Sequence, residues 1–178
     1  MTIEIRKLAD NSSEGIENIV KDLTSVVEEE VTAFQTLLDV LVEQQESIVK
    51  GDTNSVSSSN EEMETIVAET KRLGKERWGK SKDLSQYLNT DRALSISQII
   101  PLIEEKYAHR LNELKKDLGS LSEKIQNTNK RNRYLLEHSL QFVNNCLRVL
   151  TQGQGGIHSY SREGTVDVRE TSLYSGLG

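Results

Sequence analysis

The sequence predicts an all-α protein, an elongated antiparallel helical bundle or coiled coil of three main helices, one of them very long, with a flexible C-terminal tail. Three observations carry this prediction. Apolar residues recur at helical spacing over long stretches, the 178-residue chain holds a single proline, and 28% of its residues are charged while only 4% are aromatic. Long helices that bury one stripe and solvate the rest have this balance, and a single proline leaves them almost uninterrupted.

The first helix is predicted over about residues 15–50, after a loose leader over residues 1–14. Apolar residues occupy every seventh position of this helix: Val20, Val27, Phe34, Leu41 and Ile48. This heptad pattern is typical of a coiled-coil-like seam. Gly51 suits the residue that follows a helix C-terminus, and Asp52 can cap whatever comes next.

The second helix is predicted over about residues 55–79. Its beginning is rich in Ser, Thr and Asn, which favour caps and turns, so we expect it to fray there. Ser59 and Glu62 form a capping-box pattern that marks a firmer start. The turn before the helix is short, so the helix should fold back antiparallel on the first one. Trp78, near its end, is expected to pack against a neighbouring helix.

The third helix is predicted over about residues 101–151, after short helical turns between residues 82 and 100. Pro101 suits the first turn of a helix and should push Ile100 toward an extended conformation. Apolar residues keep 3-4 spacing along this helix, except for one polar step of eleven residues between Ile125 and Leu136, which predicts a stutter. The seam resumes at Leu136, Leu140, Val143, Leu147 and Leu150.

The length of the third helix makes part of its seam available for binding. A helix of about 50 residues is roughly 75 Å long, and two shorter helices cannot cover all of it unless each pairs with a different half. We therefore expect some of its apolar surface to remain for another chain. At any single position of the resumed seam, burial against the first helix is nevertheless the simpler expectation.

Residues 153–178 are predicted to form a flexible, partner-binding tail. The run Gln152-Gly153-Gln154-Gly155-Gly156 is a linker composition. The residues beyond it show no sustained period and cannot build a core alone, yet they include more apolar side chains than a spacer needs. We interpret the tail as a segment that becomes ordered on a partner. Its predicted contact residues are Tyr160, Val166, Val168, Leu173, Tyr174 and Leu177.

Composition argues against several classes of function. The net charge is −6, which disfavours nucleic acid as a partner, and the short basic run Lys130–Arg133 is interpreted as a solvated helix face. No apolar run approaches the length of a membrane span, and the N-terminus lacks the apolar region of a signal peptide. We expect a cytoplasmic protein without membrane insertion. Cys146, the only cysteine, is expected to be a buried small hydrophobe.

Catalytic and metal-binding motifs are also missing from the sequence. A di-iron site in a bundle needs Glu-x-x-His pairs, and neither His109 nor His138 follows a glutamate at that spacing. The glycines of the linker lack the Gly-Lys-Ser/Thr of a phosphate loop. The adjacent carboxylates Glu28-Glu29-Glu30 point in different directions on a helix and are interpreted as a solvated face. We expect no catalytic, cofactor or metal residues and no cofactor.

Two segments resemble a known family. Residues 132–140 read Asn-Arg-Tyr-Leu-Leu-Glu-His-Ser-Leu, and a Tyr-x-x-x-Gly turn follows at residues 160–164. The phrase and the turn resemble the end of the long last helix in the FlgN family of flagellar type III export chaperones. Residues 37–52, with Leu37-Leu38, Leu41, Glu43, Gln44, Ile48 and Gly51-Asp52, are similar to the end of the family's first helix and its turn.

The resemblance implies a chaperone that binds the C-terminal segments of hook-associated (hook-filament junction) proteins, keeps them unassembled and delivers them to the flagellar export machinery. An apolar helical seam can shield such amphipathic segments by helix-in-groove packing. The alternative is a structural coiled-coil scaffold or adaptor that dimerises through the long third helix, so self-association is possible. A permanent coiled coil would continue its heptads through residues 127–132, where this sequence is polar.

Overall fold

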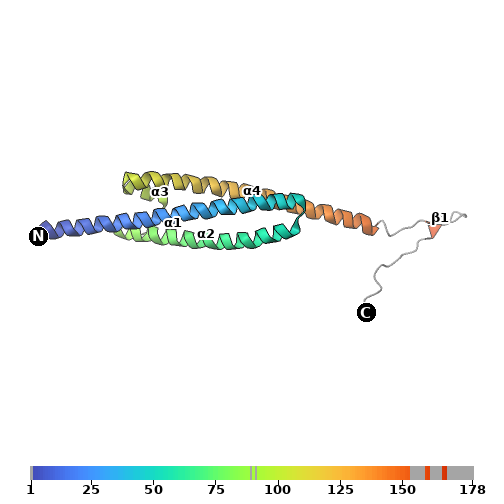
Figure 1. Ribbon diagram of the computed structural model, residues 1–178, viewed down its shortest axis with the longest axis horizontal. Helices are drawn as coiled ribbons and strands as arrows, with labels where there is room; N and C mark the ends of the chain where they lie inside the picture. Colours follow the sequence, from blue (N-terminus) through green and yellow to red (C-terminus); the bar gives the residue numbers. More distant parts are fainter. Residues whose placement is uncertain (1, 89, 91, 153–158, 161–165, 168–178) are drawn as a thin grey trace, which may run out of the picture. The chain divides into compact units, whose positions relative to one another are not determined.

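The computed structural model is an all-α bundle, which confirms the predicted fold class (Figure 1). It describes residues 2–88, 90, 92–152, 159–160 and 166–167, with side chains over 14–88, 90 and 92–151. The helices are α1 (Thr2–Lys50), α2 (Thr53–Tyr87), α3 (Ile96–Ile99), the 3-10 helix η1 (Ile100–Leu102) and α4 (Glu105–Gln152). Two short strands, β1 (Ser159–Tyr160) and β2 (Val166–Asp167), pair antiparallel, with Tyr160 opposite Val166.

The chain divides into two units, Met1–Asn132 and Arg133–Gly178. The first unit holds α1, α2, α3, η1 and the beginning of α4. Gly51, with φ of 71°, ends α1 in the left-handed region that glycine adopts without strain. The Asp52 side chain accepts a hydrogen bond from the backbone N–H of Ser55 at 3.1 Å and so caps α2. Both features agree with the sequence prediction for this turn, and α2 folds back antiparallel on α1 (Figure 1).

The first two helices are longer than expected from the sequence. α1 begins at Thr2, where a loose leader over residues 1–14 was expected. Residues 2–14 contain neither glycine nor proline, and a helix propagates readily once it is nucleated. α2 covers residues 53–87 rather than 55–79. It continues through Gly79, which costs about 1 kcal/mol in a helix, because Leu84 beyond it is fully buried.

The connection to α4 follows the predicted short turns but differs at Ile100. This residue is helical, with φ of −45° and ψ of −48°, instead of extended. Ile99 is fully buried and Ile100 packs against the same core, so tertiary packing overrides the preference of a residue before proline. Pro101 lies in the first turn of η1. Ile103 is extended, and α4 therefore begins at Glu105 rather than at residue 101.

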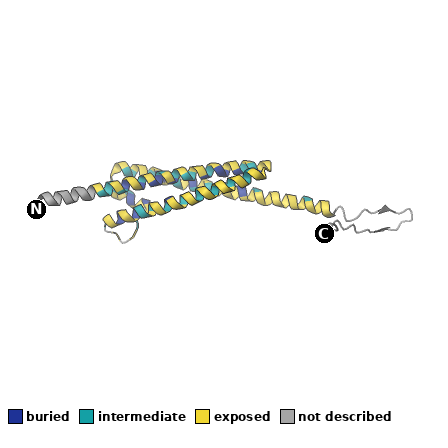
Figure 2. Ribbon diagram, turned by 60° about the horizontal axis from the view of Figure 1, so that its bottom comes forward, coloured by how far each residue is buried: buried dark blue, intermediate teal, exposed yellow. Residues whose placement is uncertain are grey.

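An apolar core joins all the helices of the first unit (Figure 2). Each buried side chain contributes about 1.5–3 kcal/mol relative to full exposure, so this cluster stabilises the unit. Its fully or almost fully buried members are Val20, Leu23 and Val27 of α1, Leu84 of α2, Ile96 and Ile99 of α3, and Leu111 and Leu114 of α4.

Ion pairs connect the helices of the first unit. Arg77 Nε of α2 is 2.7 Å from Glu30 Oε2 of α1, and Arg110 Nε of α4 is 2.7 Å from Glu28 Oε1. Glu30 is only 5% exposed, so the predicted solvated face at residues 28–30 is wrong for this residue. Successive helical side chains point in different directions, and the one that turns inward meets the guanidinium of Arg77, which offsets its desolvation.

Candidate functional site

The end of α4 exposes the resumed apolar seam. Leu136, Leu140, Val143, Leu147 and Leu150 are 37–67% exposed. Burial was the simpler expectation for each position and is wrong, because residues 133–151 belong to the second unit, outside the core cluster of the first. Figure 2 shows this part of α4 as almost continuously exposed. The helix itself continues to Gln152, supported by an i,i+4 pair at 2.9 Å between Arg133 and Glu137.

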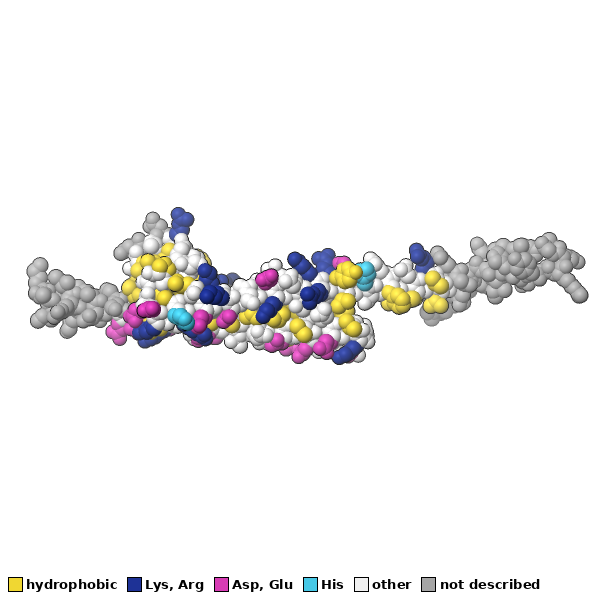
Figure 3. All heavy atoms as spheres, turned by 90° about the horizontal axis from the view of Figure 1, so that it is seen from above, with side chains coloured by type: hydrophobic (Ala, Val, Ile, Leu, Met, Phe, Trp, Pro, Cys, Tyr) yellow, Lys and Arg dark blue, Asp and Glu magenta, His cyan; other side chains and the backbone are white. Residues whose placement is uncertain are grey.

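A second apolar seam lies beside the first. It contains Leu135, Phe142, Cys146 and Val149, of which Phe142 and Val149 are 70% and 68% exposed. Each member precedes a residue of the first seam by one position, or about 100° around a helix. The two seams together give this end of α4 a broad apolar surface, and Figure 3 shows hydrophobic side chains gathered on it. Large contiguous apolar patches on a protein surface are often interaction sites, which makes this surface a candidate site.

The second seam was missed by the sequence analysis, although a signal for it exists. Leu118, Leu121 and Ile125 keep 3-4 spacing, and the same spacing continued through polar Thr128 and Asn132 arrives at the second seam. Counting only apolar residues made the polar step look like a break. Cys146, expected to be buried, is half-buried on this seam.

Asn132 lies in the polar interval between Ile125 and Leu136, and its side chain is buried in the bundle. It is 1% exposed, and its Nδ2 donates to the backbone oxygen of Leu41 at 2.8 Å and to Oε1 of Gln44 at 3.0 Å. Gln44 Nε2 donates in turn to Asn60 Oδ1 at 2.8 Å. The chain of amides links α4, α1 and α2, and α4 is continuous through the predicted stutter. The first unit ends at Asn132, so this network holds the last inward turn of α4 within it.

The basic residues around Asn132, in the run Lys130–Arg133, were predicted to form a solvated helix face. Lys130, Arg131 and Arg133 are exposed, which confirms a solvated face apart from the buried asparagine between them. Asn132 Oδ1 is buried without a hydrogen-bond partner among the described residues. A buried polar atom in this state costs about 1–3 kcal/mol, so the two bonds made by its Nδ2 carry the stabilising part of the network.

The beginning of α4 is anchored to α1 by Glu17. Its Oε1 accepts hydrogen bonds from Lys106 Nζ at 3.1 Å and from the Tyr107 hydroxyl at 3.0 Å, and Lys21 Nζ lies 3.3 Å away. The bonds from Lys106, Tyr107 and Lys21, in that order, lower the pKa of Glu17 from 4.5 to about 2. The carboxylate is therefore ionised at neutral pH and contributes to the contact between the two helices.

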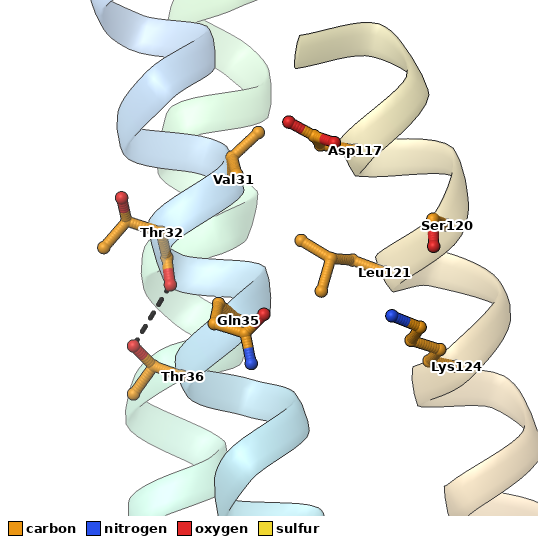
Figure 4. A pocket seen from close by; sticks show the side chains of 8 residues that line it. All are labelled: Val31, Thr32, Gln35, Thr36, Asp117, Ser120, Leu121 and Lys124. Carbon is orange, nitrogen blue, oxygen red and sulfur yellow. Dashed lines mark hydrogen bonds between the residues drawn. The ribbon is translucent and has the colours of Figure 1, made fainter. Parts of the chain in front are cut away.

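A groove between α1 and α4 in the first unit has no arrangement of side chains that suggests catalysis (Figure 4). Thr36 Oγ1 donates to the backbone oxygen of Thr32 at 3.1 Å, and so completes a local helix contact. Asp117 and Lys124 lie seven residues apart on α4. Nucleophilic catalysis needs a nucleophile within hydrogen-bond reach of a base, and the side chains of this groove make no such pair. It is lined by Val31, Thr32, Gln35, Thr36, Asp117, Ser120, Leu121 and Lys124.

The described residues offer neither a metal site nor a membrane span. Among these residues, no group of three His, Cys, Asp or Glu side chains could hold a metal ion. No helix in the described part of the chain is long and apolar enough to cross a membrane. The exposed seams of α4 thus remain the strongest candidate functional feature.

Comparison with protein families identifies the chain. The family model described as FlgN protein matches residues 19–167, which include the core of the first unit, the amide network and both seams. The chain belongs to the FlgN family. Members of this family are chaperones, not enzymes, and membership indicates a role in flagellar export. No curated protein and no solved structure matches the chain.

The FlgN-family match also extends into the tail, where several predicted contact residues lie. Tyr160 and Val166 are paired positions of β1 and β2. The structure describes the backbone of these two residues but not their side chains. The other predicted contact residues of the tail lie outside the described residues: Val168, Leu173, Tyr174 and Leu177. The described half of the predicted site is therefore the first seam, to which the structure adds the second.

Proposed function

We propose that this chain is a cytoplasmic chaperone that binds hook-filament junction proteins and delivers them to the flagellar type III export apparatus. The observation that carries the proposal is the exposed pair of seams on α4 in a member of the FlgN family. An amphipathic client helix can bury its apolar face against such a surface. The client is thereby kept from polymerising until export.

The exposed side chains of the seams contribute little to folding and can still bury apolar area against a client. Side chains such as Leu140, Phe142 and Val149 are 64–70% exposed. They still have most of their apolar area to bury, at about 25 cal/mol per Å². Since this part of α4 is already helical, a client would not have to pay for ordering it.

The tail from residue 153 onward is proposed as the second part of the client site. A glycine-containing linker joins it to α4, which lets it reach a client already seated on the seams. A tail that orders on binding lowers the net affinity, because ordering opposes association. Modest affinity suits a chaperone that must release its client at the export gate.

Direct binding measurements test the proposal. The full chain should bind a purified C-terminal segment of a hook-filament junction protein, and a chain ending at Gln152 should bind at least tenfold more weakly, which is ~1.4 kcal/mol. Leu140→Asp combined with Leu147→Asp should also weaken binding, whereas Lys115→Asp on the exposed surface of the first unit should not. Circular dichroism should remain helical for all variants.

The scaffold alternative predicts a different result from the same proteins. The 4-3-4-3 spacing of the first seam would also suit a second copy of α4. Sedimentation equilibrium should then show a dimer that the Leu140→Asp, Leu147→Asp pair dissociates. A stable dimer that binds no junction segment would contradict the chaperone proposal and favour the scaffold.

A further inference from the structure

Trp78 is exposed on α2, contrary to the sequence prediction. It is the only tryptophan in the chain and is 59% exposed. The ammonium of Lys82 lies 5.4 Å from the centroid of its ring. Tryptophan is the residue type most enriched among the energetic centres of protein interfaces, and the bundle core does not use this one.

Three exposed lysines share the helix face of Trp78. Residues 71, 75, 78 and 82 follow one another in steps of four, three and four, which places them in a narrow row along one side of a helix. Lys71, Lys75 and Lys82 are all exposed. We name these three lysines together with Trp78 the lysine–tryptophan stripe.

The other basic residues in this part of α2 form ion pairs with described side chains, unlike the lysines of the stripe. Arg72 contacts Glu69 and Glu76 at 2.7 Å, Arg77 contacts Glu30, and Lys80 contacts Asp22 at 2.6 Å. No lysine of the stripe forms an ion pair with a side chain that the structure describes. The basic residues committed to the fold and those on the stripe are therefore different sets.

We propose that the lysine–tryptophan stripe is a docking surface for an acidic segment of a partner protein that carries an apolar residue for Trp78. Three ammonium groups complement carboxylates at helical or extended spacing, and the indole supplies the apolar anchor. The proposal does not depend on the α4 seams, which belong to the second unit. It gives the chain a second protein-binding surface of different chemistry.

Charge favours an acidic protein segment over other anionic partners. Membrane recruitment by basic residues takes clusters of about 4–8 Lys and Arg, and the stripe has three. The chain carries a net charge of −6, which opposes approach to the dense charge of a nucleic acid or an anionic bilayer. A short acidic peptide presents few charges beyond those that the stripe can pair.

Trp78 provides a built-in probe for the test. The probe ligand is a fluorescein-labelled two-heptad peptide with leucine at two positions per heptad, glutamate at four other positions and alanine elsewhere, and its counterpart carries lysine in place of glutamate. The acidic peptide should change the emission of Trp78 and bind with an affinity that falls as salt is raised. The basic peptide should bind at least tenfold more weakly.

Matched variants locate the binding. Lys71→Glu, Lys75→Glu and Lys82→Glu together should weaken acidic-peptide binding at least tenfold by fluorescence anisotropy. The control, Lys115→Glu, Lys116→Glu and Lys130→Glu, changes net charge equally on exposed positions of α4 and should weaken it less than threefold. Leu140→Asp should leave the emission change at Trp78 intact.

Three results would overturn the proposal. The first is equal weakening by both triple variants, which would mean that net charge alone governs binding. The second is acidic-peptide binding without any change in Trp78 emission. The third is tighter binding to a DNA oligonucleotide or to vesicles containing phosphatidylglycerol than to the peptide, which would assign the stripe to another class of partner.

Discussion

The two halves of α4 carry the same pattern and have opposite environments. Leu111, Leu114 and Leu121 are at most 6% exposed in the first half, whereas Leu140 and Leu147, at similar spacing in the second, are 64% and 53% exposed. One continuous helix holds both sets. The spacing therefore determines which side chains share a face, and the neighbouring helices determine whether that face becomes core or stays exposed.

The largest expected effect comes from truncating one leucine in each half. Leu114→Ala should lower the free energy of unfolding by about 2–5 kcal/mol, since it leaves a cavity in the core. Leu140→Ala should change it by less than about 0.5 kcal/mol, because an exposed side chain loses little on truncation. Urea unfolding followed by circular dichroism measures both. Equal destabilisation by the two variants would mean that the second half of α4 is also core.

The amide network should give the next largest effect. Asn132→Ala removes the Nδ2 group that donates to Leu41 and Gln44 and leaves the buried Oε1 of Gln44 without this donor, so the free energy of unfolding should fall by about 1–3 kcal/mol. Asn129→Ala, three residues earlier and exposed, is the matched control and should be close to neutral. If both variants had the same stability, the buried network would contribute nothing to holding this turn of α4.

Acid should weaken the anchor at the start of α4, with the smallest effect. The pKa of Glu17 is about 2 in the folded chain and 4.5 without its partners. Its stabilisation is therefore fully present above pH 4.5 and is lost as the pH falls toward 2. The urea midpoints of the wild type and of Glu17→Gln should differ at pH 6 and converge between pH 4.5 and 2. A difference that stays constant over this range would show that ionisation of Glu17 is not involved.

Much of the first unit could be predicted from the sequence because local chemistry decides it. The heptad spacing gives α1 its buried face, and Gly51 and Asp52 end one helix and begin the next. The bounds of α2 could not be predicted in this way. Ser- and Asn-rich residues near its start and Gly79 are weak helix formers, and the helix passes through them because tertiary contacts such as that of Leu84 outweigh small propensity differences.

The candidate site was predicted in part, and the errors have one cause. The first seam lies on one face of α4, as its spacing predicts, but the sequence does not state what lies opposite that face. For the same reason two other residues were predicted wrongly. Trp78 was expected to be packed and is exposed, and Glu30 was expected to be solvated and is buried. Asn132 was read as part of a polar interruption, since only its partners Leu41 and Gln44, about 90 residues away in the chain, make it an inward residue.

Amide hydrogen exchange of the whole chain, with and without a purified junction-protein segment, tests most directly that one half of α4 is core and the other binds the client. In the free chain, amides of residues 105–132 should exchange more slowly than those of 133–152, since tertiary packing protects only the first half. Addition of the segment should slow exchange at 133–152 at least tenfold and leave the core residues of the first unit unchanged. Protection confined to residues 105–132, with 133–152 unaffected, would contradict the account.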